Sequence, residues 1–412
     1  MLAAGAAALV AAVVVVVVLP RAGEDGSPRP ATLARTVPPP RSTSTPASPP
    51  PARTAGREWG LTFLSAAPDS EPRAVALVQD LIAGHRADGA AHGITSTRTI
   101  VPWDVALPPD PALGAAQTEP DKLAALDRWV QTMTGLGLTP MVSFEHSRSA
   151  AYDKDDPAAN PLPTPAQYRA AMTAFLDHYR AQGAAGWDYT AWNEPNLATQ
   201  PTEQARRRPA AWPPVSAGAP AVPARWHFGA AMAVRYLQEL RGLCGQVGRT
   251  CRVLPGDFSG AADFSWDASD WYRTYRHFVG GGEELWAWHD YRDVTRGTTA
   301  DLRAFLAAVP GARVWITEVG PLFFRGCNPA GPRRPCPEPL TPERQAAADA
   351  ALTRRWAAYV AELQRPPIWD RLHGLTYYMV YGDRNWDSGL LSRDGVPRPA
   401  VYAPLVTLTA RP

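Results

Sequence analysis

The chain has 412 residues, of which 45% are hydrophobic, and its 41 basic and 39 acidic residues give a formal net charge of +2. Such a length and composition exclude a small disulfide scaffold and a wholly disordered chain, and the near-neutral charge provides no net field to recruit nucleic acid. Lysine occurs only at Lys122 and Lys154, and the GxGxxG, GxxxxGK(S/T) and HExxH motifs are absent. Schiff-base, nucleotide-binding and zinc-protease chemistry are therefore disfavoured.

The first 56 residues differ in composition from the rest. Leu2 to Leu19 carry no charge and approach the length of a bilayer span, so residues 1–19 are predicted to be a signal-anchor or a signal peptide. The lack of a basic flank and of a clear cleavage site favours the anchor. Residues 20–56 hold ten prolines, all between positions 20 and 53, and are predicted to be a disordered linker. We expect an extracellular protein, membrane-anchored or secreted, whose folded domain spans residues 57–412.

From residue 57 onward, strand and helix signals alternate. Runs rich in β-branched and aromatic residues predict eight strands, at Glu58–Leu64, Thr95–Trp103, Thr139–His146, Asp188–Asn193, Arg252–Phe258, Leu285–Tyr291, Arg313–Glu318 and Leu375–Tyr381. Helical apolar spacing predicts helices between them, for example at Pro72–Gly89, Lys122–Gly135, Pro165–Gln182 and Pro342–Leu363. Eight such units predict an α/β fold of the (β/α)₈ TIM-barrel type. A doubly wound sheet is the alternative, but its glycine-rich first turn is missing.

The connections between these elements have unequal lengths. Helix-to-strand connections such as 135–138 and 183–186 are short, whereas the strand-to-helix connections 147–164, 197–223 and 320–341 are long. In a barrel all strand-to-helix loops lie at the C-terminal ends of the strands, where active sites are built. Long loops on that face alone indicate a substrate cleft.

The cysteines form two close pairs, Cys244 with Cys251 and Cys327 with Cys336. Neither pair has the spacing of a metal or redox motif, so two local disulfides and an oxidising compartment are predicted. Four reduced, buried thiols are the alternative.

Two glutamates stand where a predicted strand meets its loop. Glu194 lies in Ala191-Trp192-Asn193-Glu194-Pro195, at the end of the fourth strand, and Glu318 lies near the end of the seventh, Val314-Trp315-Ile316-Thr317-Glu318. Each could instead cap a helix or pair with an arginine, but a carboxylate next to an apolar strand is costly unless a function retains it. Two carboxylates that converge on one cleft are what glycosidic-bond cleavage requires.

At these two positions the sequence resembles the clan A, or "4/7", retaining glycoside hydrolases, and the resemblance extends over the whole predicted barrel. It implies that Glu194 is the acid/base, that Glu318 is the nucleophile and that Asn193 binds the 2-hydroxyl of the sugar. Because Glu194 is expected to lack a cationic partner and is flanked by Trp192 and Pro195, we expect its pKa to be raised and the group to hold the proton.

The same resemblance assigns supporting residues. His289 and Tyr291 are two apart on the sixth predicted strand and should share a face; the clan places the tyrosine on the nucleophile and the histidine near the acid/base. Both could instead be core residues. Arg98 on the second strand is expected to hold the nucleophile, with a surface arginine as the alternative. His146 after the third strand is expected to contact substrate.

Tryptophans are the expected sugar-stacking surfaces. Trp386 lies five residues beyond the eighth strand rather than on it, as a departure from the clan pattern, and is expected to supply a stacking face. Some of the tryptophans at predicted strand ends or in cleft-side loops should do the same and others should be ordinary barrel core, the candidates being Trp103, Trp192, Trp212 and Trp266.

The sequence thus predicts a retaining glycoside hydrolase that acts on an oligosaccharide or polysaccharide. No metal and no cofactor are expected, because two glutamates explain the chemistry and no ligand set is visible. A transglycosylase with the same intermediate, or a catalytically silent glycan-binding barrel at the cell surface, are the alternatives.

Overall fold

The structure is a computed structural model. It describes residues 57–62, 75–79, 93–108, 117–148, 162–207, 222–246, 248–260, 264–325, 341–382, 386–392 and 395–409. The predicted anchor, the predicted linker, Trp212, Cys327 and Cys336 lie outside these ranges, as do most residues of the three long loops. No helix in the described ranges is both long enough and apolar enough to cross a membrane.

Nine strands of the described chain form one parallel sheet. They are β1 (Glu58–Thr62), β2 (Ile94–Pro102), β3 (Thr139–Glu145), β4 (Asp188–Thr190), β5 (Arg252–Leu254), β6 (Gly256–Ser259), β7 (Leu285–His289), β8 (Arg313–Val319) and β10 (Leu372–Tyr378). Their order is β5-β4-β3-β2-β1-β10-β8-β7-β6. Because Pro255 alone separates β5 from β6, the two ends of this order are parts of one strand. The sheet therefore closes into an eight-stranded barrel, which excludes the doubly wound alternative.

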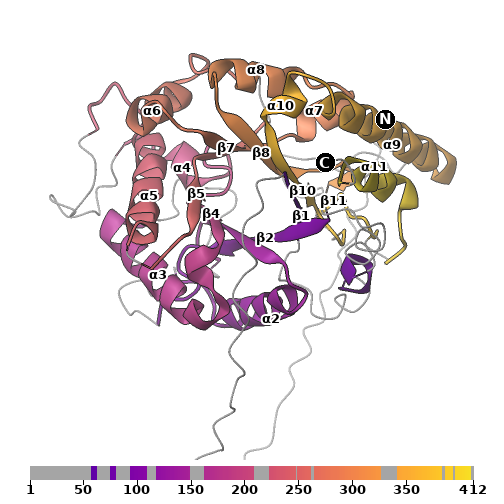
Figure 1. The fold of residues 1–412 in the computed structure, drawn as a ribbon. Coiled ribbons are helices and arrows are strands. Elements are labelled where there is room, and N and C mark those ends of the chain that lie inside the picture. Colours follow the sequence, from indigo (N-terminus) through magenta and orange to yellow (C-terminus); the bar gives the residue numbers. More distant parts are fainter. Residues whose placement is uncertain are drawn as a thin grey trace, which may run out of the picture. The chain divides into compact units, whose positions relative to one another are not determined.

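Helices lie around the strands, which occupy the middle of the fold (Figure 1). The helices are α2 (Asp121–Gly135), α3 (Pro165–His178), α4 (Pro201–Gln204), α5 (Phe228–Cys244), α6 (Asp270–Val279), α7 (Tyr291–Arg296), α8 (Ala300–Ala308), α9 (Pro342–Leu363), α10 (Ile368–Arg371) and α11 (Pro399–Thr409). Residues 75–79 are also helical. A short antiparallel pair, β9 (Phe324–Arg325) with β11 (Trp386–Asp387), lies apart from the barrel sheet.

Local sequence explains where several helices begin. The Thr164 hydroxyl accepts from the backbone of Gln167, whose side chain binds back to Thr164, and Pro165 takes the first helical position of α3. Thr341 and Pro342 start α9 in a similar way. The predicted helix Pro165–Gln182 is shorter than expected, because α3 ends at His178 and a 3₁₀ turn, Arg180–Gln182, follows.

The core lies in two layers. A small cluster of Met141, Leu254, Ala287 and Trp315 fills the inside of the barrel, while a large aromatic-rich cluster packs between the strands and the helices. Three of the proposed sugar-stacking tryptophans, Trp103, Trp192 and Trp266, are buried in this large cluster. These three are therefore core residues, because a strand-end or loop position brings a large ring under the helices as readily as into the cleft.

Candidate active site

The C-terminal ends of the strands surround a cavity of about 350 Å³. Six of the eight predicted site residues line it, namely Asn193, Glu194, His146, Tyr291, Glu318 and Trp386. The other two, Arg98 and His289, are fully buried behind it and bind the glutamates directly. The structure therefore brings all eight residues together.

Glu318, on β8, has three polar neighbours. Its Oε2 accepts a hydrogen bond of 2.7 Å from Arg98 Nη1, and its Oε1 accepts one of 2.7 Å from the Tyr291 hydroxyl. His289 Nδ1 lies 3.5 Å from Oε2. Burial and the nearby carboxylate of Glu194 raise the pKa of Glu318 above its usual value, although the positive charges of His289 and Arg98 and the hydrogen bond from Tyr291 favour the ionised form.

Arg98 is a buried hub rather than a surface arginine. Its Nη2 donates to Asn193 Oδ1 at 2.7 Å and to Asp257 Oδ2 at 3.1 Å, and its Nε donates to Ser143 Oγ at 3.0 Å. Although burial opposes its charge, the carboxylates of Asp257 and Glu318 raise the pKa of Arg98. A buried guanidinium that is bound to carboxylates in this way stays charged and holds those carboxylates in a fixed orientation.

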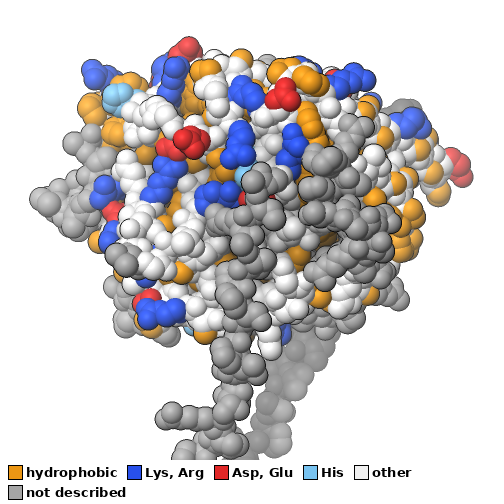
Figure 2. Space-filling model, in the orientation of Figure 1, with side chains coloured by type: hydrophobic (Ala, Val, Ile, Leu, Met, Phe, Trp, Pro, Cys, Tyr) orange, Lys and Arg blue, Asp and Glu red, His pale blue; other side chains and the backbone are white. Residues whose placement is uncertain are grey.

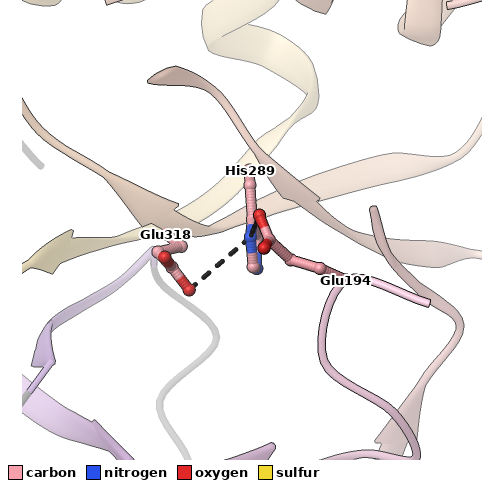
Figure 3. Close-up of side chains that lie close together, drawn as sticks. All are labelled: Glu194, His289 and Glu318. Carbon is pink, nitrogen blue, oxygen red and sulfur yellow. Dashed lines mark hydrogen bonds and ion pairs between the residues drawn. The ribbon is translucent and has the colours of Figure 1, made fainter. Parts of the chain in front are cut away.

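Glu194 lies in the loop after β4, which ends at Thr190, and its carboxylate faces His289 and Glu318 (Figure 3). Glu194 Oε1 lies 3.1 Å from His289 Nδ1, and a carboxylate oxygen of Glu194 lies within 4.8 Å of one of Glu318. The expectation that Glu194 has no cationic partner was wrong. Burial lowers the pKa of His289, but the carboxylates of Glu318 and Asp257 and the hydrogen bonds to Asp257 and Glu194 raise it to about 10. The missing partner comes from a strand far away in the sequence.

Tyr291 reaches Glu318 by a route that the sequence did not predict. The sixth strand ends at His289, and Tyr291 is the first residue of α7. The two side chains therefore do not share a strand face, although each binds the carboxylate cluster. The resemblance was right about the contact, and the strand-spacing argument for it was wrong.

His146 and Trp386 form parts of the cavity wall. His146 Nδ1 donates to the carbonyl of Ser147 at 2.9 Å, and its Nε2 is 3.7 Å from Glu145. Trp386, on β11, packs edge-on against Tyr291 with 5.0 Å between ring centroids. The half-buried indole ring is thus the one candidate sugar-stacking tryptophan of the described residues that lines the cavity.

Asp257 is a site residue that the sequence analysis missed. It lies on β6, is almost fully buried, and its Oδ1 is 2.9 Å from His289 Nε2. Its only sequence signal is an acidic residue inside a predicted strand. Glu318 was identified from the same signal together with a familiar motif, whereas no familiar motif surrounds Asp257.

Three of these side chains also meet the geometric requirement for a cation site. One ligand atom each of Glu194, His289 and Glu318 lie within 4.8 Å of one another. A histidine ligand must be neutral, whereas His289 has a raised pKa and Arg98 supplies a second positive charge beside Glu318. The cluster therefore suits proton transfer better than metal binding.

No family model matches the sequence, and no curated protein matches it. Solved structures do match. An exo-β-1,4-mannosidase from an Opitutaceae bacterium has a TM-score of 0.52 at 12% identity, over 86% of this chain and 59% of that one. A GH5_18 protein of Bifidobacterium longum in complex with Manβ1-4GlcNAc has a TM-score of 0.50 at 14% identity, over 86% and 78%.

A third match is the GH53 catalytic domain of Ignisphaera aggregans, with a TM-score of 0.50 at 13% identity over 88% of this chain and 99% of that one. The chain shares its (β/α)₈ TIM-barrel fold with these three proteins. At these identities the likeness is one of fold. It confirms the predicted architecture of the barrel and leaves the chemistry to be argued from the cavity.

Proposed function

We propose that the chain is a retaining glycoside hydrolase in which Glu318 is the nucleophile and Glu194 is the acid/base. The observation that carries this is that one carboxylate oxygen of Glu194 lies within 4.8 Å of one of Glu318 across the cavity. Retaining enzymes need about 5–5.5 Å between the carboxyl groups, whereas inverting ones leave roughly 6.5–9.5 Å for a water molecule.

The contacts support these separate roles. Arg98 and Tyr291 both bind Glu318, as a nucleophile that must be ionised requires. Glu318 attacks the anomeric carbon while the glycosidic C–O bond breaks, and Glu194 gives its proton to the leaving oxygen. Glu194 then takes a proton from water, which displaces Glu318 and restores the free enzyme. Neither step calls for a metal or a cofactor.

The substrate is proposed to be an oligosaccharide or polysaccharide. Two of the solved barrels that resemble this one in fold are an exo-β-1,4-mannosidase and a protein in complex with Manβ1-4GlcNAc. Asn193, His146 and Trp386 line the cavity, and an amide, an imidazole and an indole are groups that bind hydroxyls and the C–H faces of sugars. Asn193 is proposed to bind the sugar 2-hydroxyl.

The test is a screen of the purified protein on aryl glycosides and polysaccharides, followed by two variants on the best substrate. Glu318→Gln should lose nearly all turnover, whereas Glu194→Ala should keep slow turnover of glycosides with good leaving groups, which need no proton. Glu239→Gln, on the outer helix α5, serves as the control. Proton NMR of the first-formed product should show net retention.

Other outcomes would redirect the assignment. An inverted first product would remove Glu318 from the nucleophile role. Transfer to a sugar acceptor in preference to water would identify a transglycosylase. Tight glycan binding by the intact chain without turnover of any glycoside would favour the binding barrel.

We also propose that the protein acts outside the cell, held at the membrane or secreted through residues 1–19, with residues 20–56 as a spacer. The disulfide between Cys244 and Cys251 supports an oxidising compartment. Deletion of residues 1–56 should then give soluble protein with unchanged turnover of small glycosides. Size-exclusion chromatography and the aryl-glycoside assay measure this, and loss of folding on truncation would contradict the spacer role.

A further inference from the structure

His289 stands between one carboxylate behind it and two in front of it. It is fully buried at the end of β7. On one side, its Nε2 lies 2.9 Å from Asp257 Oδ1. On the other side, its Nδ1 lies 3.1 Å from Glu194 Oε1 and 3.5 Å from Glu318 Oε2 (Figure 3). The protonation of the two ring nitrogens therefore decides whether Glu194 receives a hydrogen bond from His289.

The hydrogen-bond partners of Asp257 determine whether His289 Nε2 carries a proton. Its Oδ1 accepts from the Thr317 hydroxyl at 2.6 Å, and its Oδ2 accepts from the Thr190 hydroxyl at 2.7 Å and from Arg98 at 3.1 Å. Four donors, His289 included, thus converge on one carboxylate. Burial raises the pKa of Asp257, but Arg98 and His289 hold it well below its usual range. An ionised carboxylate only accepts, so His289 Nε2 must be the donor.

Arg98 also comes within 3.3 Å of His289 Nε2, and this contact is not a hydrogen bond to the ring. The two hydrogens on Arg98 Nη2 go to Asn193 and Asp257, so none remains for the imidazole. Arg98 and His289 are therefore two donors directed at the same acceptor. This leaves Nδ1 as the only ring nitrogen that faces the cavity carboxylates.

Four charged groups face His289, each from a different segment. They are Asp257 from β6, Glu318 from β8, Glu194 from the loop after β4, and Arg98 from β2. Three are carboxyl groups and one is a cation. Burial lowers the pKa of His289, but the carboxylates raise it more, to about 10. The ring is therefore an imidazolium near neutral pH.

We propose that Asp257 is a positioning residue that acts through His289. Its carboxylate binds Nε2–H, holds the ring as an imidazolium and directs Nδ1–H to Glu194 Oε1, which leaves the other oxygen of Glu194 to face the leaving group. When Glu194 gives up its proton in the proposed reaction, its new carboxylate remains hydrogen-bonded to a positive charge. His289 keeps both of its own protons throughout, so proton and charge balance are those of the two-glutamate mechanism on which this inference rests.

A measurement that needs no substrate tests the histidine directly. Nitrogen-15 NMR of the full chain reports the protonation of each histidine ring from about pH 5 to about pH 11. This range covers both ordinary histidines and the raised pKa of His289. In the wild-type chain one buried histidine should keep both nitrogens protonated beyond pH 8. In Asp257→Asn, which removes the charge and keeps the shape, its pKa should fall by about 1–3 units. Its signal is assigned from His289→Gln.

Asp104→Asn is the matched control. Asp104 is equally buried and accepts from Thr118 and Ser147, yet no contact joins it to His289 among the described residues, so the titration should not move. A wild-type His289 that is neutral at pH 7 overturns the proposal even if Asp257→Asn does not fold. An unchanged His289 titration in a folded Asp257→Asn also overturns it.

Kinetics give the second readout. On a phenyl glycoside, which needs the proton, Asp257→Asn should lose at least about tenfold more kcat/KM than on the 2,4-dinitrophenyl glycoside, which does not. Equal losses on the two would mean a merely structural role and would overturn the proposal. Because the NMR result stands without turnover, failure of the proposed hydrolase function and failure of this inference are distinguishable.

Discussion

Glu194 and Asp257 share an uncommon backbone conformation. Their φ values are 45° and 57°, in the left-handed region that non-glycine residues rarely adopt. The Glu194 N–H donates to the Asp257 carbonyl at 3.0 Å, so the two conformations support each other. Such conformations cost on the order of 1–3 kcal/mol each and gather at functional sites. The hydrogen bonds of the Asp257 carboxylate offset part of that cost.

Glu145 is an acid of the cavity wall that the sequence analysis did not assign. It ends β3, is almost fully buried, and its Oε1 accepts from Arg148 Nε and Nη2 at 2.8 and 2.5 Å. Burial raises the pKa of Glu145, but Arg148 and His146 lower it more. Its Oε2 lies 3.7 Å from His146 Nε2, and because Glu145 lines the cavity, this carboxylate can accept a hydrogen bond from a sugar hydroxyl.

We predict that Glu145→Gln weakens substrate binding, because hydrogen bonds to charged groups contribute about 1.5–3 kcal/mol. KM for the substrate found in the screen should rise about tenfold or more, with a smaller change in kcat. Glu239→Gln, which changes a similar ion pair on α5, is the control and should leave KM as it is. Equal KM values in both variants would exclude Glu145 from the sugar site.

How far the sequence predicted this site depends on the kind of signal each residue carries. Glu194 and Glu318 stand in recognisable motifs, and Arg98 was identified through the resemblance. Asp257 was missed because its role comes from four partners on other strands, which no local pattern records. Positions were thus predictable where a motif exists, whereas hydrogen-bond partners required the closed barrel.

At the scale of elements, prediction worked best where a residue stops or starts the backbone pattern. Helix α9 was predicted to the residue, from Pro342 to Leu363. The fourth strand was predicted too long, since β4 ends at Thr190 and the following residues bend toward the cavity. The fifth strand was predicted unbroken, but Pro255 cannot donate to the ladder and Gly256 has a φ of 94°, so it splits into β5 and β6.

The disulfide between Cys244 and Cys251 connects the end of α5 to the segment just before β5. It confirms one of the two predicted pairs. Because β5 begins there, the disulfide lies at the N-terminal end of the barrel, away from the cavity. It closes a loop with a sequence separation of 7, so chain entropy alone gives it about 2–3 kcal/mol.

We therefore predict that Cys244→Ala with Cys251→Ala lowers the free energy of unfolding by about 2 kcal/mol and leaves kcat/KM unchanged at temperatures where the protein is folded. Urea unfolding and the glycoside assay measure the two effects. The wild-type chain unfolded under reducing conditions should match the double variant. A fall in kcat/KM in the folded variant would contradict the separation of this region from the cavity.

At the scale of the whole molecule, basic and acidic residues nearly balance, with a formal net charge of +2, and ion pairs join strands at the closed end of the barrel. Basic and acidic side chains are interspersed on the face seen in Figure 2. At the N-terminal ends of the strands, Arg252 of β5 binds Glu58 of β1 at 2.9 Å and Asp188 of β4 at 3.0 Å. Its guanidinium also lies over Trp315 of β8. One arginine thus connects strands from around the ring and closes the end opposite the cavity.

Glu58 makes this closure dependent on pH. Burial raises its pKa, but hydrogen bonds from His373 and Arg252 and the charge of Arg252 lower it to about 2, against about 4.5 when the chain is unfolded. Between these values the unfolded chain binds more protons, so the stabilisation is complete above the unfolded pKa and is lost as the pH falls through about 2. A difference of this size corresponds to about 3 kcal/mol.

Glu58→Gln should therefore destabilise the chain by about 3 kcal/mol at pH 7 and by progressively less as the pH falls from about 5 to about 2, because the wild-type chain loses its own carboxylate there. Urea unfolding of both chains across that range measures the difference. Glu362→Gln, which alters an exposed pair with Arg365, should cost less than about 1 kcal/mol at every pH. If the difference between wild type and Glu58→Gln is the same at pH 7 and pH 3, the ionised Glu58 does not stabilise the closed end of the barrel, and only its shape matters there.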